Sequence, residues 1–116
     1  MGLVISLRAR DPCVEGDRHM VDLMATVTSV PLYFMGTHTH AEHEEFWAQT
    51  ASGPIEVIDN VDLAPRVPVQ PGDQIEVCGE EVTDPGKSAP IVHWTHHDPA
   101  HHHPDGFIRF RGQVYA

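Results

Sequence analysis

The sequence predicts an all-β protein, folded as one small, five-stranded, partly open barrel with a short helical linker turn and a C-terminal hairpin. Three observations support this fold class. Several short segments place an apolar residue at every second position, which is the pattern of half-buried strands. The 10 prolines and 9 glycines supply the turns between such segments. A length of 116 residues suits a single domain with one core.

The chain divides into an N-terminal segment and a barrel domain. Residues 1–18 are expected to form an arm or a short strand, and residues 19–116 the single domain. In HMVDLMATVTSV, residues 19–30, apolar and polar side chains alternate, which predicts the first long strand. Pro31 ends it, and residues 31–43 are expected to form a loop.

The next two strands are predicted to form a hairpin. In HEEFWAQTA the alternation puts Phe46 on one face and Trp47 on the other, so each face of this strand should be partly covered. A Ser-Gly-Pro turn follows, and residues 55–58 begin the third strand.

The linker and the remaining strands suggest a particular kind of barrel. LAP favours one helical turn, which Pro65 and Pro68 prevent from growing, and a Pro-Gly-Asp turn opens the fourth strand, QIEVCGEEV. The fifth strand is predicted at residues 91–97, and a hairpin over Gly112 ends the chain. Oligonucleotide-binding (OB) barrels commonly have this order of elements, namely a strand, a hairpin, a short helical linker and a strand that follows such a turn. The predicted fold is therefore OB-like.

The two cysteines leave the pairing question open. Cys13 lies in a polar N-terminal segment and Cys78 in the middle of the fourth strand. A disulfide is compatible with these positions but is not indicated by them. A buried, unpaired small hydrophobic residue is the expectation for Cys78.

The charge disfavours some classes of partner. A formal charge of −10 with only 7 lysines and arginines makes nucleic-acid binding unfavourable. No apolar run reaches the roughly 18 residues of a membrane span. MGLVISLRAR does not have the pattern of a signal peptide, because its arginines follow a short apolar part. Localisation stays open between the cytoplasm and secretion after processing, and the oligomeric state is not indicated.

The histidines are distributed very unevenly. Six of the ten lie between His93 and His103, in HWTHHDPAHHH. Neutral imidazole is the commonest protein metal ligand, and a nearby carboxylate can ligate as well or orient a ligating ring. The segment therefore predicts a site for a divalent transition metal, namely zinc, copper or nickel. In the alternative interpretation His93 and His96 are structural and residues 101–103 are solvated.

One metal site needs ligands from several segments, because side chains four residues apart on a straight strand are too distant to share an ion. The predicted ligands are His43, His96, Asp98 and His103, with His93 and His97 as reserves. Asn60 and Asp62 are expected to hold imidazoles by hydrogen bonds, unless they simply cap the linker turn. The loop histidines His38, His40, His101 and His102 would serve metal capture or be solvated by chance.

Four segments resemble an uncharacterised bacterial family, a domain of unknown function marked by an HWTHHDP box. They are NVDLAPR, the Gly-Asp turn, HWTHHDP and HPDGFIRFRGQVY. The resemblance covers residues 21–115 and implies a small β domain with a polar site and a histidine at the position of His43, but no known reaction. The chain departs from the pattern in a longer histidine-rich loop at residues 32–41, in Ala100-His101-His102, and at Phe107, where tryptophan is usual.

Three functions remain open. The first is a transition-metal-binding barrel. The second is a metal-dependent hydrolase of phosphodiesters or similar substrates, in which the ion lowers the pKa of a bound water. Arg66 could there bind a small anionic substrate, although pairing with an acidic residue is the simpler expectation. The third is an oligonucleotide-binding or small-molecule-binding OB-like module, which the acidic charge disfavours.

Overall fold

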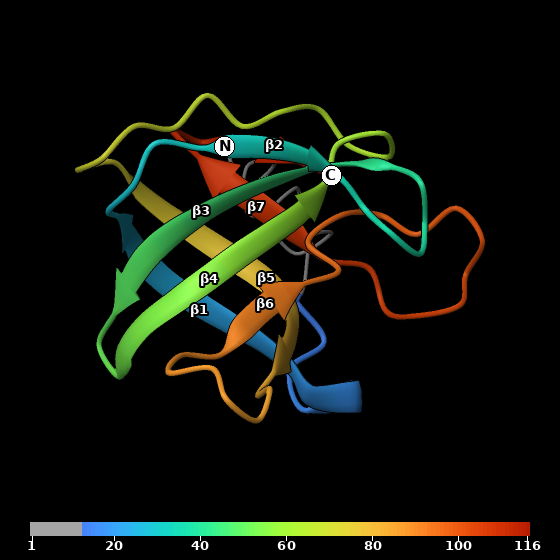
Figure 1. The fold of residues 1–116 in the computed structure, drawn as a ribbon, viewed down its shortest axis with the longest axis horizontal. Helices are drawn as coiled ribbons and strands as arrows, with labels where there is room; N and C mark the ends of the chain where they lie inside the picture. Colours follow the sequence, from blue (N-terminus) through green and yellow to red (C-terminus); the bar gives the residue numbers. More distant parts are fainter. Residues whose placement is uncertain (1–12) are drawn as a thin grey trace, which may run out of the picture.

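The computed structural model describes residues 13–116. This part of the chain contains one short 3-10 turn and eight strands joined in one sheet. In chain order they are η1 (Asp17–His19), β1 (Met20–Val27), β2 (Leu32–Met35), β3 (Glu42–Thr50), β4 (Gly53–Asn60), β5 (Gln74–Val82), β6 (Ile91–His93), β7 (Phe107–Phe110) and β8 (Gln113–Tyr115). Figure 1 labels β1 to β7. The expected all-β domain is confirmed.

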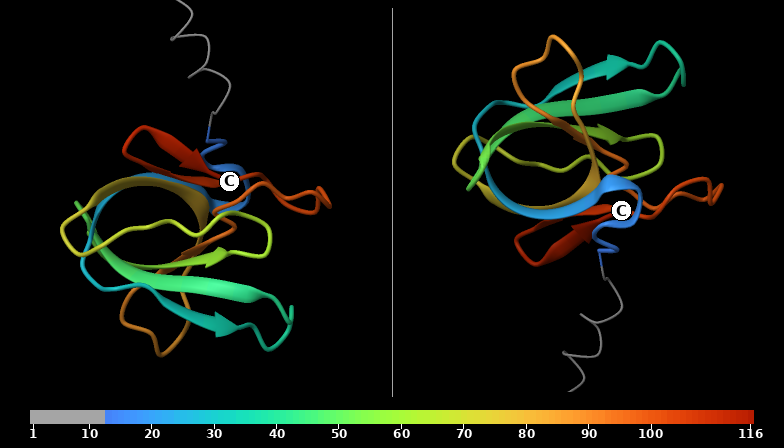
Figure 2. Two further views of the ribbon diagram at one scale, coloured as in Figure 1. Left: turned by 90° about the horizontal axis from the view of Figure 1, so that it is seen from above. Right: turned by 90° about the horizontal axis from the view of Figure 1, so that it is seen from below.

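Five strands close into a barrel. β1 pairs with β3, β3 with β4, β4 with β6, β6 with β5, and β5 again with β1. All these pairs are antiparallel except β4–β6, which is parallel. This is the OB-like order that the sequence predicts. The ring, seen end-on in Figure 2, is more complete than the expected partly open barrel, because β5 pairs with β1 over seven successive positions.

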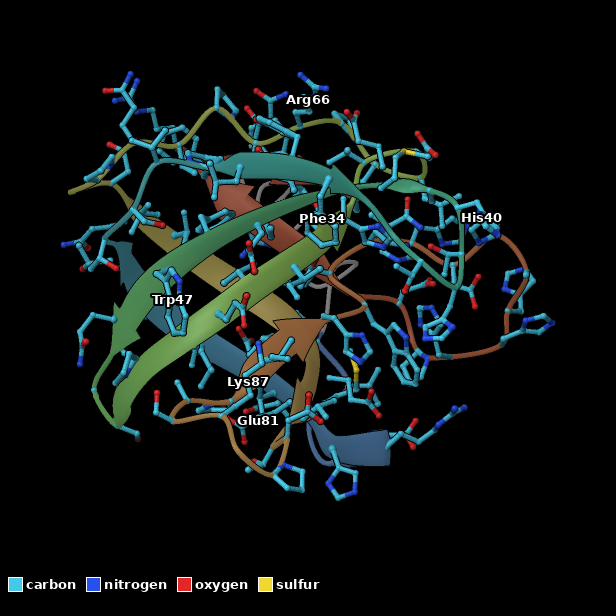
Figure 3. The ribbon with its side chains drawn as sticks, viewed as in Figure 1. Phe34, His40, Trp47, Arg66, Glu81 and Lys87 are labelled. Atoms are coloured by element: carbon cyan, nitrogen blue, oxygen red, sulfur yellow. A yellow bond between two sulfur atoms is a disulfide. The ribbon has the colours of Figure 1, made fainter. Side chains whose placement is uncertain are left out.

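The barrel interior holds the main core. Inward-facing side chains of every barrel strand are buried there, among them Phe46, Val57, Val77 and Val92. On β3 the alternation is as predicted: Phe46 points inward and is 1% exposed, while Trp47 lies on the outer face (Figure 3) and is 38% exposed. Burial of one face of each strand therefore explains the period-two pattern.

The segment predicted as a loop contains an additional strand. β2 pairs with the first four residues of β3, and the four residues of β2 are all exposed. The linker after β4 makes the single helical turn that was expected, in which the Ala64 N–H donates to the Asn60 carbonyl at 3.1 Å. The hairpin at the end of the chain is also confirmed, since β7 and β8 pair across Arg111 and Gly112.

The predicted fifth strand is interrupted, so its assignment to residues 91–97 was too long. β6 ends at His93, opposite Glu80 of β5, and β7 resumes on the same strand with Phe107 opposite Cys78. Residues 94–106 thus leave and rejoin one barrel strand as a loop (Figure 1); we call them the histidine loop. Trp94 has a φ of 58°, a left-handed conformation that ends the alternation.

Because the strand conformation stops at Trp94, the side chains after it do not alternate between two faces. In a continuous strand Thr95 and Val92 would point to opposite faces, yet both are fully buried. The rejoining point is tight. A Cβ on Gly106 would stand 2.0 Å from the Trp94 carbonyl oxygen and 2.4 Å from that of Cys78, so this close approach of three backbone segments needs a glycine.

Gly106→Ala is therefore expected to lower the free energy of unfolding by about 2 kcal/mol, because two backbone carbonyls must move to admit the methyl group. Urea denaturation of this variant beside Ser88→Ala, which changes an exposed loop residue, measures the difference. The control should remain within about 0.5 kcal/mol of the wild type. An unfolding midpoint unchanged by Gly106→Ala would show that the loop does not cross the barrel strand this closely.

The cysteines are paired, contrary to the expectation of a free Cys78. Cys13 and Cys78 form a disulfide with their Cα atoms 5.8 Å apart, while Cys78 is fully buried as predicted. The bond attaches the N-terminal segment to β5. Residues 13–18 are thus part of the fold, and the rest of the predicted N-terminal arm lies outside the described residues. Within residues 13–116 no helix is long and apolar enough to cross a membrane.

Candidate functional site

A pocket of about 350 Å³ lies where the outer face of the barrel meets the histidine loop. The barrel strands provide its floor and the loop provides one wall. Its lining contains four histidines, together with aliphatic, aromatic and polar side chains: Thr39, His43, Ile58, Asn60, Leu63, His93, Trp94, His96 and His103. Four of the six predicted ligands therefore share one pocket.

Strand pairing brings two of these histidines to the same face. His43 on β3 lies directly opposite Asn60 on β4. His93 is the residue after Val92, which pairs with Val57 of β4, so it comes beside Ile58. Outward-facing positions of three adjacent strands thus form the floor. His96 and His103 come from the histidine loop.

Aromatic rings flank the histidines. Phe34 of β2 stacks on His43 with ring centroids 5.5 Å apart. Trp94 stacks on His103 at 4.1 Å and on His93 at 5.1 Å. The exposed strand β2 therefore contributes a ring contact to one pocket histidine, which the sequence did not indicate.

Each pocket histidine has one ring nitrogen bonded to an oxygen acceptor. Nδ1 of His43 donates to the Ala41 carbonyl at 2.9 Å, Nδ1 of His96 to the His97 carbonyl at 2.7 Å, and Nδ1 of His103 to the Pro104 carbonyl at 2.8 Å. Since a carbonyl can only accept, the proton resides on Nδ1 and Nε2 carries the lone pair. Nε2 of His103 lies 3.7 Å from Oδ2 of Asp98.

His93 is bonded in the opposite sense. Its Nε2 lies 2.6 Å from Oε1 of Glu80, so the carboxylate accepts from Nε2 and Nδ1 keeps the lone pair. A ring that donates one N–H to a carbonyl or carboxylate has the arrangement usual for a metal-ligating histidine.

His96 is held in its neutral form. The residue is buried, and burial lowers the pKa of its imidazole, with His103 lowering it further against the opposing effect of the His97 carbonyl. A neutral ring is the form that binds a metal ion.

Asp98 makes hydrogen bonds within the histidine loop, and its predicted role as a ligand remains a prediction. Its carboxylate accepts the backbone N–H groups of Ala100, His102 and His103 at 3.0, 2.6 and 3.0 Å. Although desolvation raises the pKa of Asp98, these three donors lower it to about 2. Asp98 is not among the residues that line the pocket, and its hydrogen bonds hold the shape of the histidine loop. Its Oδ2 also lies 3.7 Å from Nε2 of His103, which does line the pocket.

His97 is also separated from the set. Its Nδ1 lies 3.0 Å from Oδ2 of Asp105, and half of its side chain is exposed. It lines a different pocket, of about 620 Å³, on the other side of the loop. The loop histidines His38, His40, His101 and His102 are all exposed, and a role for them in metal capture remains a prediction.

Asn60 and Asp62 both accept hydrogen bonds from backbone N–H groups, and among the described residues neither is hydrogen-bonded to an imidazole. Oδ1 of Asn60 accepts the Asp62 N–H at 3.0 Å, and Oδ2 of Asp62 accepts the Glu42 N–H at 3.1 Å. Asn60 still lines the pocket, whereas Asp62 does not. Capping of the linker turn, the alternative considered from the sequence, accounts for the Asn60 contact, whereas the Asp62 contact joins the linker to the start of β3.

The ligands do not converge on one point. Across residues 13–116 no group of three or more histidine, cysteine, aspartate or glutamate side chains is close enough to hold a metal ion. The rings of His96 and His103 are nearly perpendicular, with centroids 5.5 Å apart. Binding an ion would require the histidine loop or the loop before β3 to move inward.

Sequence analysis missed a buried carboxyl group beneath the loop. Asp59 is fully buried, its Oδ1 accepts from the Thr95 hydroxyl at 2.8 Å, and its Oδ2 has no partner among the described residues. Burial and, to a smaller extent, Glu44 across the strand pair raise the pKa of Asp59 to about 8 against the lowering effect of the Thr95 hydrogen bond. The alternation on β3 places Glu44, the partner of Asp59, on the same inward face as Phe46. It does not reveal that this end of the barrel is covered, so that both carboxyl groups are buried.

The fold and the pocket together define a class: a small OB-like barrel with a histidine-lined pocket beside an interrupted barrel strand. The chain belongs to a family described as protein of unknown function (DUF3465), whose model matches residues 15–116. This confirms the predicted membership of an uncharacterised domain family. Neither a curated protein nor a solved structure matches the chain.

Proposed function

We propose that this protein binds a divalent transition-metal ion in the pocket through Nε2 of His43, His96 and His103. Nδ1 of His93 serves as a fourth ligand. The observation that supports this is the hydrogen bonding of the four rings, each of which donates one N–H to a carbonyl or carboxylate and has its lone pair on the other nitrogen. For His103 that nitrogen also faces Oδ2 of Asp98 at 3.7 Å.

The pocket also suits the electrostatics of such an ion. His96 is neutral because it is buried, so no proton has to be displaced from it. Glu80 is bonded to His93 and adds a negative charge beside the ligands. Imidazole ligands favour zinc, copper and nickel, with copper(II) bound most strongly in the general order of affinity.

Metal binding is tested with the full chain purified without a nickel column. Isothermal titration with zinc is expected to give one ion per chain, and His96→Ala should weaken the affinity by at least about 100-fold, because it removes a ligand rather than only its hydrogen-bond partner. His102→Ala is the matched control. Its side chain is exposed, while the backbone N–H that binds Asp98 is retained.

Equal zinc affinities for His96→Ala and His102→Ala would overturn the proposed ligand set. Elemental analysis of the same preparations provides an independent reading. A wild-type chain that binds zinc only weakly and without fixed stoichiometry would assign the metal to the exposed loop histidines instead of the pocket.

The hydrolase alternative needs an open coordination position. If only three histidines bind the ion, a water can occupy the fourth position and ionise near neutral pH. Arg66, considered as an anion-binding residue, is engaged elsewhere: its Nη2 lies 2.8 Å from Oε1 of Glu42, and its guanidinium stacks on Tyr33. Turnover of a phosphodiester that is lost with a chelator and restored by one metal would favour the hydrolase over a carrier.

A further inference from the structure

The Cys13–Cys78 disulfide lies close to the histidine loop, and we infer that it controls how firmly the loop holds the pocket ligands. Reduction of the bond would loosen the loop and weaken the metal site. This inference rests on the proposed function for its effect on metal binding. Its effect on the loop stands independently of any metal.

The first connection is direct contact beneath the loop. Cys78 lies in β5 opposite Phe107, the first residue after the loop. Its carbonyl touches Gly106, where the loop rejoins the barrel. Outside the barrel interior a second, smaller core forms here, consisting of Met20, Cys78 and Phe107 with Cys13, Trp94 and Val114 packed against them. The two sulfur atoms therefore belong to the packing that supports Trp94.

The second connection runs through Arg18, five residues after Cys13. Its Nη1 donates to the His102 carbonyl at 3.0 Å, and its guanidinium carbon lies 5.2 Å from the centre of the Trp94 ring. Trp94 in turn stacks on His103 with the rings almost parallel, at 6°. A cation over an aromatic face is attractive, so Arg18 holds the wall against which one proposed ligand rests.

The segment that carries Arg18 is strained. Gly16, Arg18 and His19 have φ values of 83°, 53° and 64°, and the left-handed conformation is unfavourable for the two residues that carry a Cβ. Such a segment keeps its shape only where the surrounding structure holds it. The disulfide at Cys13 anchors its N-terminal side, so breaking the bond lets the strained turn relax and withdraw Arg18.

The reduction is a thiol–disulfide exchange with a dithiol. Cys78 is fully buried and Cys13 only partly, so the thiolate of the reagent attacks the Cys13 sulfur and the Cys78 thiolate leaves and takes up a proton. The second thiol of the reagent then attacks the reagent sulfur that is bonded to Cys13, which releases the Cys13 thiol. Two electrons and two protons pass to the protein, and the dithiol becomes a cyclic disulfide.

The test compares the oxidised full chain with the chain after reduction and anaerobic removal of the dithiol. Amide hydrogen exchange of the metal-free protein reports on the loop, and zinc titration reports on the site. The His102 and His103 amides, which bind Asp98, are expected to exchange at least tenfold faster after reduction. Zinc affinity should fall by about tenfold, equivalent to about 1.4 kcal/mol.

Arg18→Gln separates the effect of the Arg18 contacts with the loop from the stability of the whole fold, because this variant keeps the disulfide. It is expected to speed exchange of the same two amides in the oxidised protein. Arg111→Gln is the matched control, since its guanidinium lies over Phe110 at the C-terminal hairpin, and it should leave those amides unchanged. If the reduced chain unfolds globally, the amide exchange of His102 and His103 in oxidised Arg18→Gln decides whether the N-terminal segment holds the loop.

Unchanged loop exchange in both the reduced chain and Arg18→Gln would overturn the inference. Faster exchange with an unchanged zinc affinity would overturn the coupling between the disulfide and the site. Absence of zinc binding from both redox forms would overturn the proposed function, and the exchange data would then decide the control of the loop alone.

Discussion

Loss of the disulfide is expected to lower the free energy of unfolding by roughly 4 kcal/mol. The bond joins residues that are 65 positions apart, and it therefore restricts the unfolded chain over more than half of its length. Removing it raises the entropy of the unfolded state. Because small domains are stable by only about 5–15 kcal/mol, this single bond provides a large share of the total.

Urea denaturation of the wild type with and without a reductant measures this effect. The control is Cys13→Ala/Cys78→Ala, which lacks the bond under both conditions and should unfold at one midpoint regardless of the reductant. It should also resemble the reduced wild type. Identical midpoints for the oxidised and reduced wild type would show that the unfolded chain gains little freedom when the bond opens.

Asp59→Asn is expected to stabilise the protein, and the gain should grow with pH. Burial raises the pKa of Asp59 from 3.8 to about 8, so the folded chain binds one more proton than the unfolded chain between these values. The stability contributed by this carboxyl is complete below pH 4 and is lost as the pH rises to 8. At pH 7 the free energy of unfolding of Asp59→Asn should therefore exceed that of the wild type by on the order of 4 kcal/mol.

Free energies of unfolding at pH 4, 6 and 8 check this prediction. Asp59→Asn should match the wild type near pH 4 and exceed it increasingly up to pH 8. The exposed Asp84→Asn variant should follow the wild type throughout. A gain that is the same at all three pH values would mean that Asp59 ionises as readily in the folded chain as in the unfolded one.

Local pattern was sufficient to predict most of the barrel. The alternation around Phe46 identified a strand with one buried face, because successive side chains of any strand point to opposite sides. The prolines after Asn60 limited the linker to one turn. Histidine density in residues 93–103 indicated where the pocket would be. These are properties of neighbouring residues, and a sequence displays them directly.

The interruption of the fifth barrel strand was not visible in the same way. IVHWTHH alternates well enough to suggest a continuous strand, yet Trp94 adopts a left-handed conformation and the chain leaves the sheet for residues 94–106. The reason lies on other strands. Gly106 lets the loop approach the Cys78 carbonyl, and Gly79 of β5 makes room for the His93 carbonyl. No pattern within residues 91–97 indicates these contacts.

The sequence by itself determined the all-β class, the OB-like order of elements and the candidate histidines, since these depend on residue type and short-range periodicity. Only the tertiary structure decided that Cys13 pairs with Cys78, that Asp98 accepts hydrogen bonds from the loop backbone, and that His43 lines the same pocket as His96 and His103. Each of these depends on which distant segments become neighbours when the barrel closes. Strand register sets those neighbours, and it follows from the packing of the whole core.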